Sequence, residues 1–164
     1  MTTPLARRGE IFPAFTLPGP DGSPVALEDL RARANLVLVF AADEVGGSAV
    51  TGLLEQLRTR RRELEAEVAR VVVVTARPWA NQPRDADIFP VVLDKGARVH
   101  RQVGAADGAD NPAPAVFVTD RFREIFAAYP PRQDSALPHA QAIIEWLVFI
   151  NIQCPECGAP EWPR

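Results

Sequence analysis

The chain contains two cysteines, Cys154 and Cys157, within the segment Cys-Pro-Glu-Cys-Gly near its C-terminal end. Two thiols at this spacing can supply two ligands to a metal ion, or they can cycle between a dithiol and a disulfide. Gly158 allows a tight turn that points backbone N–H groups at sulfur, as in the knuckles of zinc-binding proteins. Zn²⁺ binding, a reversible dithiol and a pair of free thiols therefore all remain open.

Zinc binding and dithiol chemistry each need more than the two cysteines themselves. A closed zinc site needs four ligands, and His139 lies at the other end of the last expected helix, about 20 Å away at 1.5 Å per residue. A two-fold homodimer would supply the missing pair and predicts half a zinc ion per chain. A reactive dithiol is disfavoured where it follows a helix C-terminus, because the negative end of the dipole opposes a thiolate, although Pro155 could begin a new turn.

A second stretch, FAADEVGGSAV from Phe40 to Val50, ends an apolar run and opens a helical pattern. Its strongest nucleophile is the hydroxyl of Ser48, which we interpret as a helix N-cap. The backbone N–H groups at Gly46 and Gly47 would suit an anion or a peptide carbonyl. The stretch is therefore a candidate binding site without an evident nucleophile.

Composition limits the classes of function. A chain of 164 residues with 47% hydrophobic content can build one domain with a sizeable core. Its net charge of −3 comes from mixed signs, without a basic face, so we expect neither a nucleic-acid partner nor a membrane partner. The N-terminal sequence lacks the apolar core of a secretory signal, and we predict a cytoplasmic protein.

The apolar patterns predict an α/β protein. Continuous apolar runs at 35–40 and 71–75 are typical of strands buried on both faces and paired in parallel through a helix over 53–68. The remaining expected elements are a hairpin over 9–30 ending in a helical turn at 27–30, a strand at 90–93, a helix over 97–103, a hairpin of 115–119 with 123–128, and a helix over 138–152 with Pro138 in its first turn. We predict one domain over 1–152, followed by the tail 153–164.

Three segments resemble one known family. They are GEIFPAFTLPGPDGSPVALEDL followed by LVLVF, then FPVVLDKGARVHRQVG, then PAVFVTD. Together they resemble the peroxiredoxin family, also called the alkyl hydroperoxide reductase and thiol-specific antioxidant family, from Gly9 to Ile152. The resemblance implies a thioredoxin fold with an N-terminal β-hairpin extension and a central mixed sheet flanked by helices. It also implies antioxidant or thiol–disulfide oxidoreductase chemistry.

The family's peroxide machinery is not matched. Its reactive cysteine belongs at the N-terminus of the first long helix, where this chain has Gly46-Gly47-Ser48-Ala49. The family threonine three residues earlier falls on Asp43 or Glu44, and the family arginine falls on Pro114. The resemblance therefore predicts that ordinary peroxidase turnover is lost and that any redox activity uses Cys154 and Cys157.

Pro114 also matches the proline that thioredoxin-like proteins keep, commonly in cis, beside their cysteines. In such relatives the proline loop presents backbone groups to an extended peptide. The alternative function is thus a noncatalytic binding module that uses Gly46, Gly47, Ser48 and Pro114 and shares a zinc knuckle across a dimer. Apart from that zinc we expect no cofactor, and the opposing interpretation of Pro114 is a simple strand-entry loop.

Overall fold

The protein is described by a computed structural model over residues 6–42, 48–78, 89–131 and 137–153, with the side chain of Ser48 also left out. The regular elements, in chain order, are β1 (Thr16–Pro18), β2 (Pro24–Ala26), the 3₁₀ helix η1 (Leu27–Leu30), β3 (Asn35–Ala41), α1 (Ser48–Thr59), α2 (Arg61–Ala66), β4 (Ala69–Thr75), β5 (Val91–Leu93), α3 (Arg98–Val103), β6 (Ala115–Thr119), β7 (Ile125–Tyr129) and α4 (Ala140–Ile152).

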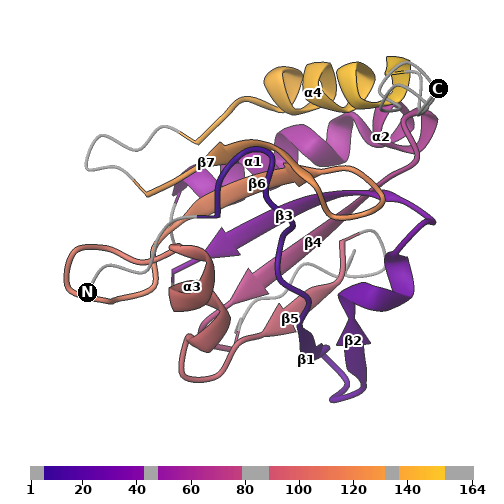
Figure 1. Ribbon diagram of the computed structural model, residues 1–164. Coiled ribbons are helices and arrows are strands. Elements are labelled where there is room, and N and C mark those ends of the chain that lie inside the picture. The colour runs from indigo at the N-terminus through magenta and orange to yellow at the C-terminus, as the bar shows by residue number, and fades with distance from the viewer. Residues whose placement is uncertain (1–5, 43–47, 79–88, 132–136, 154–164) are drawn as a thin grey trace, which may run out of the picture.

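Five of the strands form one mixed sheet in the order β5-β4-β3-β6-β7 (Figure 1). β3 pairs in parallel with β4 and antiparallel with β6, so it occupies the centre. Every residue of β3 is buried, as its continuous apolar run predicted. β1 and β2 form the expected separate hairpin. The predicted α/β fold is confirmed, including its mixed sheet and N-terminal hairpin.

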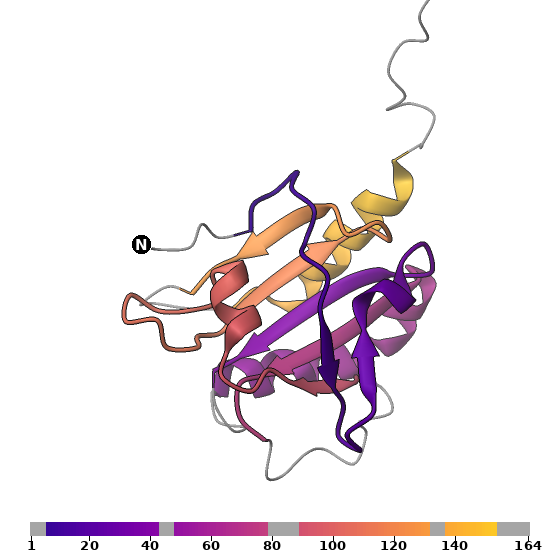
Figure 2. The same cartoon turned by 60° about the horizontal axis from the view of Figure 1, so that its bottom comes forward.

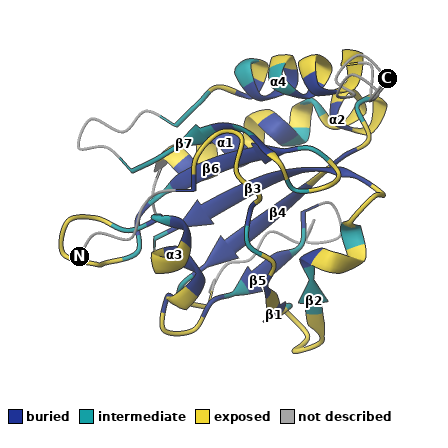
Figure 3. Ribbon diagram, in the orientation of Figure 1, coloured by how far each residue is buried: buried dark blue, intermediate teal, exposed yellow. Residues whose placement is uncertain are grey.

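Each face of the sheet has its own core, because successive side chains of a strand point to opposite faces. α1, α2 and α4 cover one face, while α3 and the β1-β2 hairpin lie on the other (Figures 1 and 2). On the second face the rings of Phe12, Phe40 and Phe117 pack with centroids 5.1–6.2 Å apart. The three central strands, β3, β4 and β6, are almost wholly buried, and the helices turn exposed residues outward (Figure 3).

The helix predicted over 53–68 is two helices. Arg60 separates α1 from α2 with non-helical torsions, φ −103° and ψ 21°. Leu53, Leu57 and Leu64 are buried as expected, but Val68 is 57% exposed and adopts a left-handed φ of 51°. The chain turns at Val68 to enter β4, and this turn directs the side chain away from the core.

The last helix also begins later than predicted. His139 is the N-cap of α4, so Pro138 precedes the helix and is not in its first turn. His139 keeps extended torsions, and its carbonyl accepts the N–H groups of Ala142 and Ile143. The predicted apolar stripe of Ile143, Ile144, Leu147 and Ile150 is buried. Within the described residues, no helix has the length and apolar content to cross a bilayer.

Candidate functional site

The first candidate site begins where β3 ends, at Ala41. The chain then passes through residues 43–47, which lie outside the described part of the structure, and α1 begins at Ser48. Gly46 and Gly47, like Asp43 and Glu44, thus fall outside the description, and of Ser48 only the backbone is described. The strand-to-helix connection expected from sequence is present at this position.

Pro114 lies at the same edge of the sheet. In the antiparallel register of β3 with β6, Phe40 is opposite Ala115, and Pro114 directly precedes Ala115. The half-buried Pro114 therefore sits beside the end of β3 that leads toward Gly46. The structure describes no cis peptide bond, so the bond before Pro114 is trans, unlike the cis bond common in thioredoxin-like proteins.

Backbone pairing and a carboxylate hold the loop before Pro114. Ala113 N–H donates to the carbonyl of Ala105 at 3.0 Å, and this pairing fixes how the chain enters β6. Asp107 accepts the backbone N–H groups of Ala109 and Asn111 at 2.8 and 3.0 Å. These two backbone hydrogen bonds lower the pKa of the Asp107 carboxyl, which is therefore anionic at neutral pH. The loop is an ordered turn on the rim of the site.

A buried polar pair supports the end of β3 from the other side. His100 of α3 and Asp94, in the turn after β5, are 0% and 1% exposed. The Nδ1 atom of His100 is 2.8 Å from Oδ2 of Asp94, and Nε2 is 3.0 Å from the carbonyl oxygen of Ala41. The ring also meets Phe40 edge-on, with centroids 5.0 Å apart. His100 therefore links the turn after β5 to the last residue of β3.

The hydrogen-bond partners of His100 determine which of its ring nitrogens carry a proton. A carbonyl oxygen only accepts, so Nε2 of His100 must donate to Ala41. A proton must also lie between Nδ1 and Oδ2, since two lone pairs cannot face each other at 2.8 Å. Burial alone would raise the pKa of Asp94, but hydrogen bonds from the His100 ring and from the backbone N–H groups of His100 and Val99 outweigh it and lower the pKa.

Sequence reasoning missed this pair. The patterns put His100 within the helix expected over 97–103 and left Asp94 between that helix and the strand expected at 90–93. One signal was available, because His100 lies between Val99 and Val103 on the face of α3 that is buried. A histidine at such a position needs buried partners, and an aspartate just before the helix is a natural one.

The segment that leads to the C-terminal cysteines ends its described part at the opposite end of the sheet. Cys154 and Cys157 lie outside the described residues, but Gln153, directly before Cys154, is described. Nδ2 of Asn35, the first residue of β3, donates to Oδ1 of Asn151 in α4 at 2.8 Å. The tail therefore leaves the domain beside the start of β3, whereas Ala41 lies about 20 Å away at 3.3 Å per residue.

A metal site is not formed by the described residues alone. The structure there contains no group of three or more His, Cys, Asp or Glu side chains able to hold a metal ion. His139 caps the start of α4, and the tail follows its end, so the helix length separates them as the sequence predicted. The zinc and dithiol assignments of Cys154 and Cys157 therefore stay predictions.

The central mixed sheet, the helices on both faces and the N-terminal hairpin define a thioredoxin-like redoxin. A family model described as the AhpC/TSA family matches residues 8–128, and the chain belongs to this family. The family's role is peroxidase and thiol–disulfide oxidoreductase chemistry. Family membership thus confirms the resemblance drawn from the sequence.

Several solved structures share the fold. The peroxidoxin BcpB from Mycobacterium tuberculosis is 23% identical, with a TM-score of 0.71, covering 87% of this chain and 97% of its own. AhpC from Mycobacterium tuberculosis is 16% identical, with a TM-score of 0.72, and the match covers 95% of this chain and 100% of AhpC. The thiol peroxidase from Chromobacterium violaceum is 17% identical, with a TM-score of 0.71, and the match covers 92% of this chain and 91% of the peroxidase. A comparison with curated proteins finds no match.

Proposed function

We propose that this chain is a redoxin degenerate at the family's cysteine site, that it is not an ordinary peroxidase, and that any redox activity uses Cys154 and Cys157. One observation carries the proposal. The connection from β3 to α1 contains no cysteine, and the two cysteines of the chain come in sequence after α4, whose end lies beside the opposite end of β3. The family chemistry therefore has no thiol at its usual place.

The residues at the family's site do not replace that thiol. A peroxidatic thiolate attacks a peroxide oxygen and retains it as sulfenic acid. The hydroxyl of Ser48 is far less acidic, and Asp43 and Glu44 precede it in sequence, where negative charge opposes an alkoxide. Pro114 stands where the family has its arginine and brings no charge to a peroxide.

The C-terminal pair supports a different redox step. In exchange with a protein disulfide, the thiolate of one cysteine attacks one sulfur of the substrate disulfide and forms a mixed disulfide with it. The other sulfur of the substrate leaves as a thiolate. The second thiolate then displaces the reduced substrate and leaves a Cys154–Cys157 disulfide, so the pair gives up two electrons. We assign the role of dithiol donor to this pair and the role of substrate to an accessible disulfide.

Peroxide consumption tests the first part of the proposal. Purified protein with a dithiol reductant should consume hydrogen peroxide no faster than the Cys154→Ser/Cys157→Ser variant. The reason is that thiols without electrostatic activation are mostly protonated at neutral pH and react slowly with peroxide. Rapid turnover that survives in the double variant would contradict a degenerate site.

A second candidate function is a noncatalytic binding module with a zinc knuckle shared across a homodimer. The position of Pro114 beside the end of β3 favours it, because a peptide partner could contact that loop and the start of α1 together. Native mass spectrometry of protein purified without chelator separates the two functions. A dimer with one zinc ion, lost in Cys154→Ser, would support the knuckle, whereas a metal-free monomer with an intact disulfide would support the dithiol.

A further inference from the structure

A cleft of about 470 Å³ lies beside the start of β3, at the opposite end of that strand from the family's site. Its walls come from the chain entering β3, the turn between β6 and β7, the connection from α2 to β4, and the end of α4. Gln153, the last described residue before the cysteine tail, is part of the wall. The tail therefore begins at the cleft itself.

Large apolar side chains are exposed around this cleft. Val68 and Phe122 line it and are 57% and 47% exposed. Ile152, in the last turn of α4 directly before Gln153, is 72% exposed, the highest value among the large hydrophobic residues described. Apolar surface gathered at one place is typical of a docking site.

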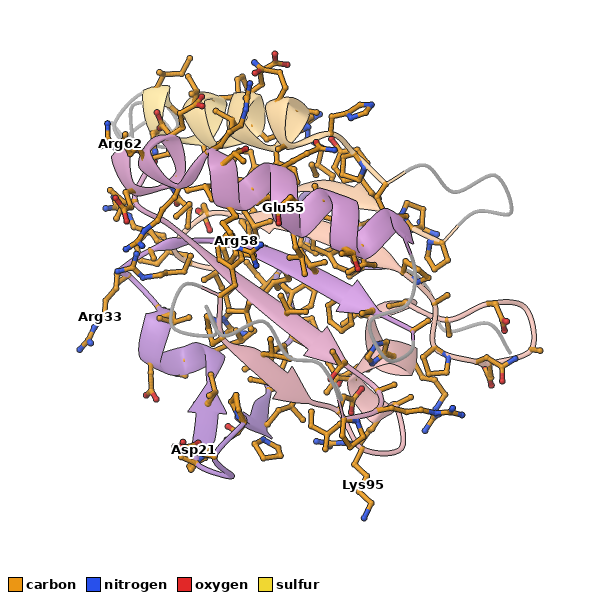
Figure 4. The ribbon with its side chains drawn as sticks, turned by 180° about the vertical axis from the view of Figure 1, so that it is seen from behind. Asp21, Arg33, Glu55, Arg58, Arg62 and Lys95 are labelled. Atoms are coloured by element: carbon orange, nitrogen blue, oxygen red, sulfur yellow. The ribbon has the colours of Figure 1, made fainter. Side chains whose placement is uncertain are left out.

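The cleft also has two arginines available to a ligand. Arg33 and Arg121 make no ion pair with any residue in the described ranges, and the Arg121 guanidinium lies 5.4 Å from the centre of the Phe122 ring. Figure 4 shows Arg33 reaching outward at the edge of the molecule. Of the two lining carboxylates, Asp120 accepts the backbone N–H groups of Phe122 and Glu124 at 2.8 Å each and so caps its own turn. An acidic and aromatic ligand would fit this lining.

We propose that the cleft is the docking site of the chain's own C-terminal tail, residues 154–164, with Glu161 facing the arginines and Trp162 on the apolar wall. The sequence supplies the matching acidic and aromatic pair, and Arg164 can meet Glu124. Between Gln153 and Trp162 an extended chain spans up to about 30 Å, ample for a cleft whose wall includes Gln153. Docking shields Cys154 and Cys157 from solvent and fixes them at this end of the sheet.

Thiol labelling tests the docking directly, because Cys154 and Cys157 are the protein's only thiols. Reduced protein with chelator is mixed with excess aromatic disulfide reagent, and the labelling rate is measured. Arg121→Glu and Trp162→Ala should each raise the rate at least about threefold. The combined variant should react no faster than the faster single variant, because either change alone releases the same docked tail. Equal rates in all proteins, or fully additive effects, would overturn the proposal.

Lys95→Glu is the matched control, since it makes the same charge change in the turn after β5, away from Arg33 (Figure 4). Its labelling rate should equal that of the wild type. Hydrogen exchange gives a reading without thiol chemistry, because a chain ending at Gln153 should lose protection at the amides of 33–35 and 120–124. Amide protection that this truncation leaves unchanged would contradict docking. Labelling rates that rise on dilution would also contradict it, because they would indicate that the cleft binds the tail of a second copy. These outcomes are independent of the proposed redox role, since they measure access and not turnover.

Discussion

Asp94 and His100 form a buried, hydrogen-bonded polar pair next to the last residue of β3. Both side chains are buried, and His100 uses both ring nitrogens, one toward Asp94 and one toward Ala41. Since Ala41 is the last residue of β3, this pair sets where the chain leaves the sheet toward the family's site. The sequence patterns correctly placed His100 in a helix and Asp94 between that helix and the preceding strand, but hydropathy patterns do not report which buried polar groups meet across elements.

The lowered pKa of Asp94 gives a pH prediction. Asp94→Asn should destabilise the fold by about 2 kcal/mol near pH 7, because it weakens charge-assisted hydrogen bonds in a buried site. A carboxyl whose folded-state pKa is lowered stabilises the fold above the unfolded-state value and loses that contribution as the pH falls through the folded-state value. The difference between wild type and variant should therefore shrink below about pH 4, as measured by urea unfolding across pH.

Asp21→Asn is the matched control for this experiment. The Ser23 hydroxyl lowers the pKa of Asp21, but this carboxylate is in an exposed turn. Its replacement should leave the unfolding midpoint nearly unchanged at each pH. A destabilisation by Asp94→Asn that is constant from pH 3 to pH 7 would show that shape, and not charge, carries the effect.

At the scale of elements, patterns predicted the strands better than the helix ends. β3 and β4 coincide closely with continuous apolar runs, because burial on both faces leaves little choice of residue. The break at Arg60 has no such signal, since Leu57 and Leu64 keep helical spacing across it. The left-handed torsion at Val68 was equally hidden, because a valine rarely adopts it.

That torsion predicts an unusual stabilising substitution. Val68→Asn should raise the free energy of unfolding by about 1 kcal/mol, because asparagine tolerates the left-handed region and little apolar packing is lost at a site 57% exposed. Val148→Asn is the control, since Val148 is 39% exposed but lies in the regular helix α4. The control should be destabilising by a few tenths of a kcal/mol. Equal losses from both changes in chemical denaturation would refute strain at Val68.

At the scale of the whole molecule, β3 separates two regions that sequence alone could not place relative to each other. Its end meets Pro114 and His100, and its start meets α4 and the exit of the cysteine tail. The family resemblance identified Gly46, Ser48 and Pro114 as one site, and Cys154 and Cys157 as another. The described residues that lead to these two sets, Ala41 and Gln153, lie toward opposite ends of β3, and this placement depends on the packing of α4 against the sheet, which no local pattern encodes.

If the family's peroxide site is lost as proposed, adding back its cysteine alone should not restore fast reaction with peroxide. In a Cys154→Ser/Cys157→Ser background, Gly46→Cys would place a single thiol in the β3–α1 connection. That thiol should react with hydrogen peroxide only as fast as an ordinary thiol, whose pKa near 8.5 leaves it mostly protonated at pH 7. Adding Pro114→Arg should speed the reaction several-fold, because the register of β6 against β3 brings position 114 beside the strand end and a guanidinium there favours the thiolate.

Gly52→Cys supplies the control, since Gly52 is an exposed position one turn into α1 with open space around it. A thiol there should react at the same slow rate with or without Pro114→Arg, because it is not part of the site that position 114 borders. The reaction is measured by stopped-flow detection of sulfenic acid formation. Fast reaction of Gly46→Cys alone would mean that the missing cysteine is the site's single defect. Slow reaction that only the arginine relieves would mean that the thiol and its electrostatic support are both absent, so that redox chemistry in the natural chain falls to Cys154 and Cys157.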